Sequence, residues 1–199
     1  PDFTSTDQEL GSLYDFFKKA SAGVCEVKSL HALTAQSGDI NGLCYVSDQP
    51  LGKFCAYDPV TNPYGYKTQA QFDQAMVDTE KMLQAACAWA NTKKLIGTDV
   101  SLDKDGDGNV DAICFVVANE VDPDSASAKA YPSYNPKIEW ADSLWPHSYS
   151  LYGDYATTLN GKITASYILQ DESFNTSGGS EPLKADTFFH EMCHLLGAP

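Results

Sequence analysis

One long segment of the chain repeats hydrophobic or small residues at helical spacing. The repeat begins after Thr68 and includes Phe72, Ala75, Met76, Thr79, Leu83, Ala86, Cys87 and Ala90. This period places the side chains on one face of an α-helix. Thr68 and Gln71 have the spacing of a capping box, in which both side chains bond to backbone N–H groups at the helix start. The pattern predicts a long amphipathic helix whose apolar face covers a sheet.

Two shorter helices are predicted near the ends of the chain. The first has Ser12 as candidate N-cap, ends near Gly23, and has four apolar residues on one face: Leu13, Phe16, Phe17 and Ala20. The last follows a Gly/Ser turn at 177–180 and starts near Ser180 or Asp186. It is rich in apolar residues, namely Phe188, Phe189, Met192, Leu195 and Leu196, so we expect it to be buried.

Strands are indicated by two other patterns. Residues 112–118 form a short, continuous apolar run rich in β-branched side chains, which is typical of a buried central strand. Residues 162–170 alternate apolar and polar side chains, which favours a half-buried strand at the edge of a sheet. A further strand is expected within 24–33, loops or a hairpin within 34–66, and irregular structure within 119–160. Helices interleaved with strands predict an α/β (α+β) fold with one sheet.

Length, composition and charge narrow the function. The 199 residues are 43% hydrophobic and 20% charged, ordinary values for a globular chain, and we expect residues 1–199 to form a single domain. The net charge of −14 argues against nucleic acid and anionic membranes as partners and suits cation binding. No run approaches the ~20 apolar residues of a membrane span. We expect a monomer.

The six cysteines do not settle the cellular compartment. Cys87, Cys114 and Cys193 lie in apolar segments and are expected to be buried thiols. Cys44 and Cys55 flank a polar stretch, and a local disulfide between them is an open alternative to two thiols.

The last helix contains the sequence HEMCH. Histidines at i and i+4 are neighbours on one helix face, so His190 and His194 can bind one zinc ion. Glu191 is then close enough to act as general base on a water activated by the metal. The alternative is an ordinary core helix with two hydrogen-bonded histidines. Two buried histidines beside a buried glutamate are costly without a partner, which favours the metal site.

The residues after this motif predict where a third ligand lies. Gly197 follows His194 by three residues and Pro199 prevents the helix from continuing, a pattern by which metzincin-like enzymes return a ligand to the metal. That ligand is expected at position 200, just after Pro199. Cys193 is either a soft ligand or redox thiol, or a small packing residue. It lies off the His190/His194 face, which favours packing.

A second candidate site is an aspartate-rich loop before residues 112–118. Oxygen-bearing side chains occupy alternate positions: Asp103, Asp105, Asp107, Asn109 and Asp111. This spacing suits Ca²⁺, with Gly108 allowing a tight turn. Cys114 replaces the glutamate that completes an EF-hand, so other ligands must complete the shell. The alternative is a solvated Asp-Gly turn. Four neighbouring aspartates repel one another without a counterion, so we predict a structural calcium ion.

Four segments in this order, DKDGDGNVDAICFVV, LWPHSYSL, KITASYILQDE and HEMCHLLGAP, resemble the M6 family of secreted zinc metallopeptidases, the immune inhibitor A type. The resemblance covers the second half of the chain well and is weaker in the first half, where SLYDFF and the strand after it are similar. It implies the upper subdomain of a metzincin-like catalytic domain, with a twisted mixed sheet, a backing helix and an HExxH active-site helix. The lower subdomain would follow residue 199.

The resemblance also implies roles for single residues. His190 and His194 would be zinc ligands, Glu191 the general base, and the loop from Asp103 to Asp111 the calcium site, with an Asp after the Gly-x-Pro turn as third zinc ligand. Cys193 stands where the family often has Gly. His147 belongs to a Trp-Pro-His segment of the family pattern, and we assign it a structural role rather than that of a third ligand. An extended peptide would pair with residues 162–170.

These observations predict a secreted, bacterial zinc endopeptidase that acts on protein or peptide substrates. Two other interpretations stay open. One is a calcium-stabilised binding or adhesion module that keeps the peptidase fold without turnover. The other is a calcium-stabilised structural domain in which HExxH occurs by chance.

Overall fold

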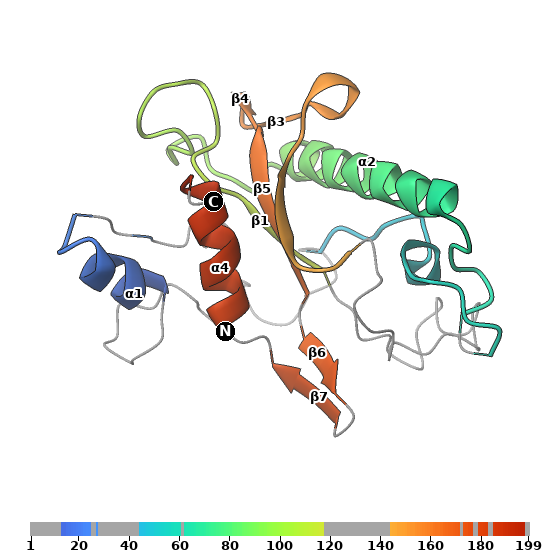
Figure 1. Ribbon diagram of the computed structural model, residues 1–199. Helices are drawn as coiled ribbons and strands as arrows, with labels where there is room; N and C mark the ends of the chain where they lie inside the picture. The colour runs from blue at the N-terminus through green and yellow to red at the C-terminus, as the bar shows by residue number, and fades with distance from the viewer. Residues whose placement is uncertain are drawn as a thin grey trace, which may run out of the picture.

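The computed structural model describes residues 13–24, 27, 44–60, 62–117, 144–171, 173–176, 179–182 and 185–197. It shows a mixed α/β fold with a small mixed sheet between helices (Figure 1). The helices are α1 (Leu13–Ala20), α2 (Gln69–Lys93) and α4 (Ala185–Leu195), with the short 3-10 helices η2 (Leu51–Phe54) and η3 (Gly153–Tyr155). None of the described helices is long and apolar enough to cross a membrane.

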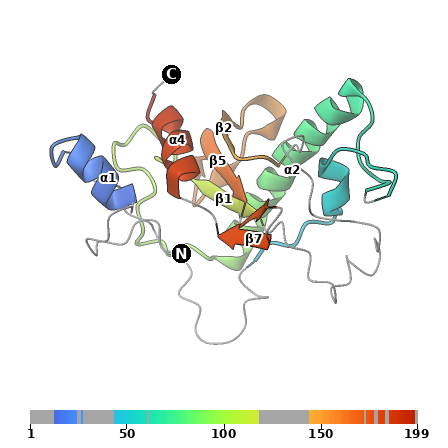
Figure 2. The same cartoon turned by 60° about the horizontal axis from the view of Figure 1, so that its bottom comes forward.

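The main sheet has three strands in the order β1 (Cys114–Val117), β5 (Ser166–Asp171) and β2 (His147–Ser150). β1 runs parallel to β5, with Cys114 opposite Ile168, and β2 runs antiparallel, with His147 opposite Leu169. The other described strands form two small antiparallel pairs: β3 (Thr158–Leu159) with β4 (Lys162–Ile163), and β6 (Ser173–Thr176) with β7 (Gly179–Pro182). The β6–β7 pair lies below the sheet in Figure 1 and comes forward in Figure 2.

The strand order corrects two predictions. Residues 162–170, expected to form one half-buried edge strand, divide into β4 and β5, and β5 is the central strand because both of its edges are paired. Residues 112–118, expected to form the central strand, contribute β1, which lies at an edge of the sheet as far as the described residues extend. The alternating pattern missed the burial of β5 because Ile168 and Gln170 are as buried as Tyr167 and Leu169.

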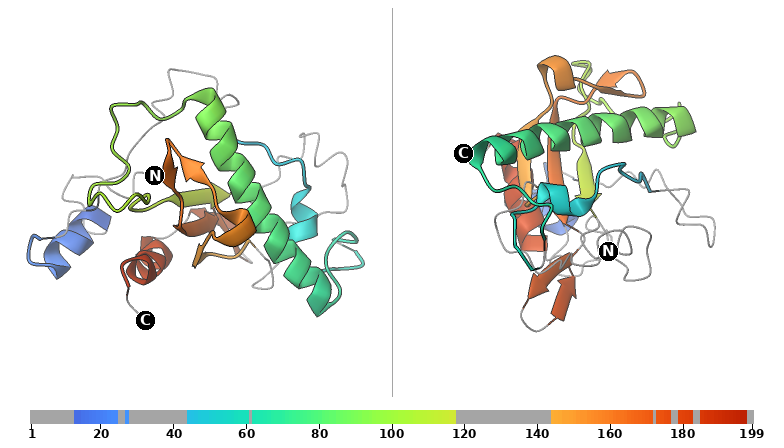
Figure 3. Two further views of the ribbon diagram at one scale, coloured as in Figure 1. Left: turned by 90° about the horizontal axis from the view of Figure 1, so that it is seen from above. Right: turned by 90° about the vertical axis from the view of Figure 1, so that its right-hand side faces the viewer.

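β5 is buried because a helix covers each face of the sheet. α2 and α4 lie on opposite sides of it (Figure 3). On one side, Tyr167 and Leu169 pack in a cluster with Leu83 of α2. On the other side, Ile168 packs with Phe188 and Met192 of α4.

Helix α2 confirms the prediction made from its periodicity. Thr68 Oγ1 accepts a hydrogen bond from the Gln71 backbone N–H at 3.3 Å. The Gln71 side chain accepts a hydrogen bond from the backbone N–H of Lys67 at 2.7 Å. The reciprocal bond of the capping box is therefore made to the residue before the N-cap, and not to Thr68 itself. The buried residues are Ala75, Thr79, Leu83 and Cys87, all on the predicted face.

Replacing Thr68 with Ala is expected to lower the free energy of unfolding by about 1 kcal/mol, because the Gln71 N–H loses its acceptor. Thr98→Ala, at an exposed turn threonine after α2, is the control and should leave it unchanged. Urea denaturation measures both. Equal midpoints for the two variants would show that the cap contributes nothing to stability.

Other predictions near the N-terminus have mixed outcomes. α1 is confirmed, and it ends as expected where Gly23, with φ of 88°, donates its N–H to the Lys18 carbonyl at 2.7 Å. Ser12 and most of residues 24–33 lie outside the described residues. The described part of 34–66 forms loops around η2 rather than a hairpin of strands. Cys44 is an exposed thiol, so a disulfide to Cys55 is not formed.

Candidate functional site

Helix α4 brings the two histidines of HEMCH together. The Nε2 atoms of His190 and His194 are 3.1 Å apart, and the ring planes are 89° apart with centroids separated by 4.6 Å. Two nitrogen ligands on one tetrahedral zinc ion, each at ~2.0–2.1 Å, lie about 3.3 Å from one another. The geometry of the pair therefore fits a shared zinc ion, and the same distance also fits a hydrogen bond between the two rings, as the alternative of an ordinary core helix requires.

Burial along α4 differs from the prediction for the histidines. His190 is exposed and His194 is partly exposed, whereas Glu191 is buried, with 7% of its surface exposed. The reason is that Phe188 and Met192 face the sheet and turn positions 190 and 194 away from it. The imidazoles are thus accessible to a metal ion. Among the described residues, no side chain or backbone donor forms a hydrogen bond with the Glu191 carboxylate.

Two hydrogen bonds fix the ring of His147 on β2. Its Nδ1 lies 2.6 Å from the Trp145 carbonyl, which can only accept, so Nδ1 carries the hydrogen. Nε2 lies 3.2 Å from the Tyr167 hydroxyl and accepts from it. The pKa of His147 is lowered, mainly because the ring is buried. The hydrogen bond to Trp145 and the negative charge of Glu191 raise the pKa, but by less than burial lowers it. A neutral ring with both nitrogens engaged fits the structural role assigned to His147.

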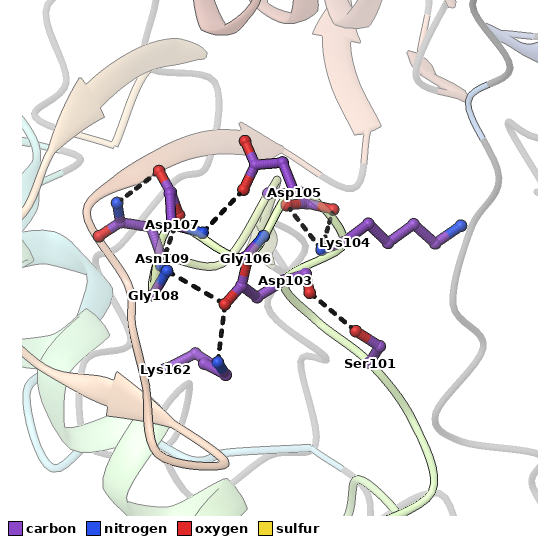
Figure 4. A network of polar contacts seen from close by, with 10 residues as sticks. Ser101, Asp103, Lys104, Asp105, Gly106, Asp107, Gly108, Asn109 and Lys162 are labelled. Atoms are coloured by element: carbon purple, nitrogen blue, oxygen red, sulfur yellow. Dashed lines mark hydrogen bonds and ion pairs between the residues drawn. The ribbon is translucent and has the colours of Figure 1, made fainter.

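The aspartate-rich loop is organised around one buried carboxylate, that of Asp103 (Figure 4). Its Oδ1 accepts the Gly106 N–H at 2.7 Å, and its Oδ2 accepts the Gly108 N–H at 3.1 Å. Both glycines have positive φ, 80° and 91°, a conformation that turns successive N–H groups inward and that other residues rarely adopt. Oδ2 also accepts a hydrogen bond from Lys162 Nζ at 2.7 Å, and this contact is the main cause of the lowered pKa of Asp103.

Three of the five predicted calcium ligands converge. Carboxylate oxygens of Asp103, Asp105 and Asp111 lie within 4.8 Å of one another, which suits a hard cation. Asp107 and Asn109 are instead bonded to each other: the Asn109 N–H reaches Asp107 Oδ1 at 2.7 Å and its Nδ2 reaches Oδ2 at 2.8 Å. The structure therefore assembles a smaller oxygen cluster than the spacing predicts.

Comparisons with known proteins give no independent assignment. No family model, curated protein or solved structure matches this chain.

Two side chains at these sites were missed by sequence reasoning. Lys162 meets Asp103 across 59 positions of sequence, and no motif links them. Tyr167 lies in the alternating segment 162–170, yet its hydroxyl also forms a hydrogen bond with His147 Nε2. The one signal in the sequence was that Lys162 is the first residue of the alternating segment 162–170. A residue at the start of a strand lies close to whatever part of the chain pairs with that strand.

The three cysteines that were expected to be buried thiols take no part in either site. Cys87 is buried, and burial raises its pKa to about 11. Cys114 and Cys193 are partly buried against the cluster of Ile168, Phe188 and Met192. This position is the packing environment that the sequence favoured for Cys193.

Proposed function

We propose that this chain belongs to the catalytic domain of a secreted, zinc-dependent endopeptidase similar to the M6 family. The observation that carries the proposal is the convergence of His190 and His194 Nε2 atoms at 3.1 Å, with the buried Glu191 between them in the helix. The mixed sheet with a helix on each face supports the metzincin-like upper subdomain. In this proposal residues 1–199 are one part of that domain.

The residues of α4 have separate chemical roles. His190 and His194 would hold the zinc ion, with a third ligand expected just after Pro199. A zinc ion bound there would supply a Lewis acid for the substrate carbonyl and would lower the pKa of a nearby water toward neutrality. Glu191 accepts the proton of the attacking water and delivers it to the nitrogen of the leaving amine. Its carboxylate can accept that proton because it accepts no hydrogen bond from any of the described residues.

The substrate would bind along β2 rather than along residues 162–170. β5 is paired on both edges, which excludes it as the strand that receives a peptide. β2 pairs with β5 on one side, and among the described strands nothing pairs with its other edge. α4 packs against β2, so an extended peptide added at this edge would lie near the histidines. Trp145, just before β2, exposes aromatic surface for apolar substrate side chains, whereas Tyr149 lies opposite Tyr167 on the α2 face of the sheet.

The aspartate-rich loop would bind a structural calcium ion. Asp103, Asp105 and Asp111 supply the converging carboxylates. The loop is also bonded to β4, because the Val110 N–H donates to the Ile163 carbonyl at 2.8 Å and the Ile163 N–H to the Gly108 carbonyl at 3.0 Å. β4 leads directly into β5, so an ion in this loop would stabilise the start of the strand that supports α4.

Zinc content of the full-length protein tests the proposal. We expect about one zinc ion per chain after dialysis, and little in His194→Ala, because one imidazole cannot hold the ion with the same strength. Leu196→Ala, at an exposed position in the turn that follows α4, is the control and should keep its zinc. Hydrolysis of an unfolded protein should stop with a chelator and return with added zinc. A normally folded, metal-free wild type would favour the structural domain in which HExxH occurs by chance.

A further inference from the structure

Lys162 places a positive charge inside the aspartate-rich loop. Its Nζ lies 2.7 Å from Asp103 Oδ2, whose side chain is 1% exposed, while the side chain of Lys162 is 43% exposed. The same ammonium is stabilised by the charge of Asp107, and both aspartates raise its pKa, the Asp103 hydrogen bond most. The ammonium therefore reaches a buried anion from the surface.

The position of Lys162 is fixed by backbone pairing. Its neighbour Ile163 is bonded on both sides to the loop, through Gly108 and Val110. The β3–β4 turn that precedes Lys162 is in turn bonded to the end of α2, where the Asn160 N–H donates to Asn91 Oδ1 at 3.0 Å. Lys162 cannot leave the loop without a change in its own rotamer or in this pairing.

The Lys162 ammonium contributes positive charge to the loop and is not needed to orient the Asp103 carboxylate. Both oxygens of Asp103 are already positioned by the Gly106 and Gly108 N–H groups. The carboxylates of Asp105 and Asp111 lie within 4.8 Å of Asp103, so an ion bound among the three would be only a few Å from Lys162 Nζ. A lysine there neutralises part of the repulsion among the aspartates and opposes a second cation.

We propose that Lys162 is a built-in counter-cation that keeps the loop folded without calcium and weakens its calcium affinity. The inference rests on the calcium site of the proposed function. It implies a loop that fills only at high calcium concentration; extracellular calcium modules bind with dissociation constants of about 10⁻⁴–10⁻³ M. A cell interior, with its low calcium, would leave Lys162 in place.

Calcium titration of the whole chain by calorimetry tests this role. Lys162→Met should bind calcium about tenfold more tightly than the wild type, because a unit charge a few Å from a divalent ion is removed. With a chelator present, it should melt about 4 °C lower, and saturating calcium should remove that difference. Lys162→Arg keeps the charge and should behave as the wild type in both measurements.

Lys104→Met is the matched control, since it removes the same charge from an exposed side chain of the same loop. Its calcium affinity should change less than that of Lys162→Met. Equal or weaker calcium binding by Lys162→Met would overturn the inference, because Lys162 would then help to position Asp103 instead of opposing the ion. Absence of calcium binding by every variant would overturn the calcium site together with the inference, and would leave the zinc peptidase proposal to its own test.

Discussion

Glu191→Gln is expected to lower kcat for peptide hydrolysis by about 10²–10⁴ in the full-length protein, with zinc content unchanged. The amide has the size of the carboxylate but cannot accept a proton from the attacking water. The two histidines do not depend on it for their positions, because their Nε2 atoms converge at 3.1 Å from each other without a bond to the Glu191 side chain. The measurement is kcat at saturating substrate, together with zinc per chain.

The matched control for this substitution is Glu80→Gln on α2, which makes the same chemical change on the opposite side of the sheet. It should retain the activity of the wild type. Equal hydrolysis by Glu191→Gln and the wild type would remove Glu191 as the base. Absence of hydrolysis in a zinc-loaded wild type would favour the binding or adhesion module instead.

The sequence predicted the parts of the site whose geometry is local. Histidines four residues apart on a helix must lie on one face, so the pairing of His190 with His194 follows from spacing alone. The same holds for α2, where Thr68 and Gln71 meet within one turn. In both cases the contacts join residues that are near in sequence, and the period of the helix determines them.

The order of the strands could not be predicted in this way. Alternation in residues 162–170 indicates one buried face, and it was taken to leave the other face in water. The other face is covered by α4, which arrives from later in the chain and packs on Ile168. Whether a strand is half buried or fully buried depends on such distant elements, and its own residue pattern does not contain that information.

Details of the two metal sites were missed for a related reason. The exposure of His190 depends on which face of α4 meets the sheet, and Phe188 with Met192 decides it. In the aspartate-rich loop, the spacing treats five oxygen ligands as equal. The structure separates them, because Asp103 is buried against Lys162 while Asp107 is bonded to Asn109. A residue 59 positions away thus changes the electrostatics of a local motif.

Substitutions at two neighbouring residues of β5 should show whether zinc binding depends on the stability of the whole fold or on the packing of α4. Leu169 is fully buried on the α2 side, in a cluster with Leu83 and Tyr167, and Leu169→Ala should lower the free energy of unfolding by about 3 kcal/mol. Ile168→Ala, on the α4 side, should cost a similar amount for the same reason. Denaturant unfolding of the zinc-free chain measures both, with Ile163→Ala, at a position 48% exposed, as the control near zero.

Zinc affinity of the folded variants should then differ. Ile168 contacts Phe188 and Met192, which set the rotation of α4 and so the direction of Glu191 and both histidines, whereas Leu169 packs in the cluster on the α2 side. Ile168→Ala should therefore weaken zinc binding, and Leu169→Ala should leave it close to that of the wild type. Equal weakening by both would mean that the metal helix responds to the stability of the whole sheet. In that case its own packing against Ile168 would not be what orients the ligands.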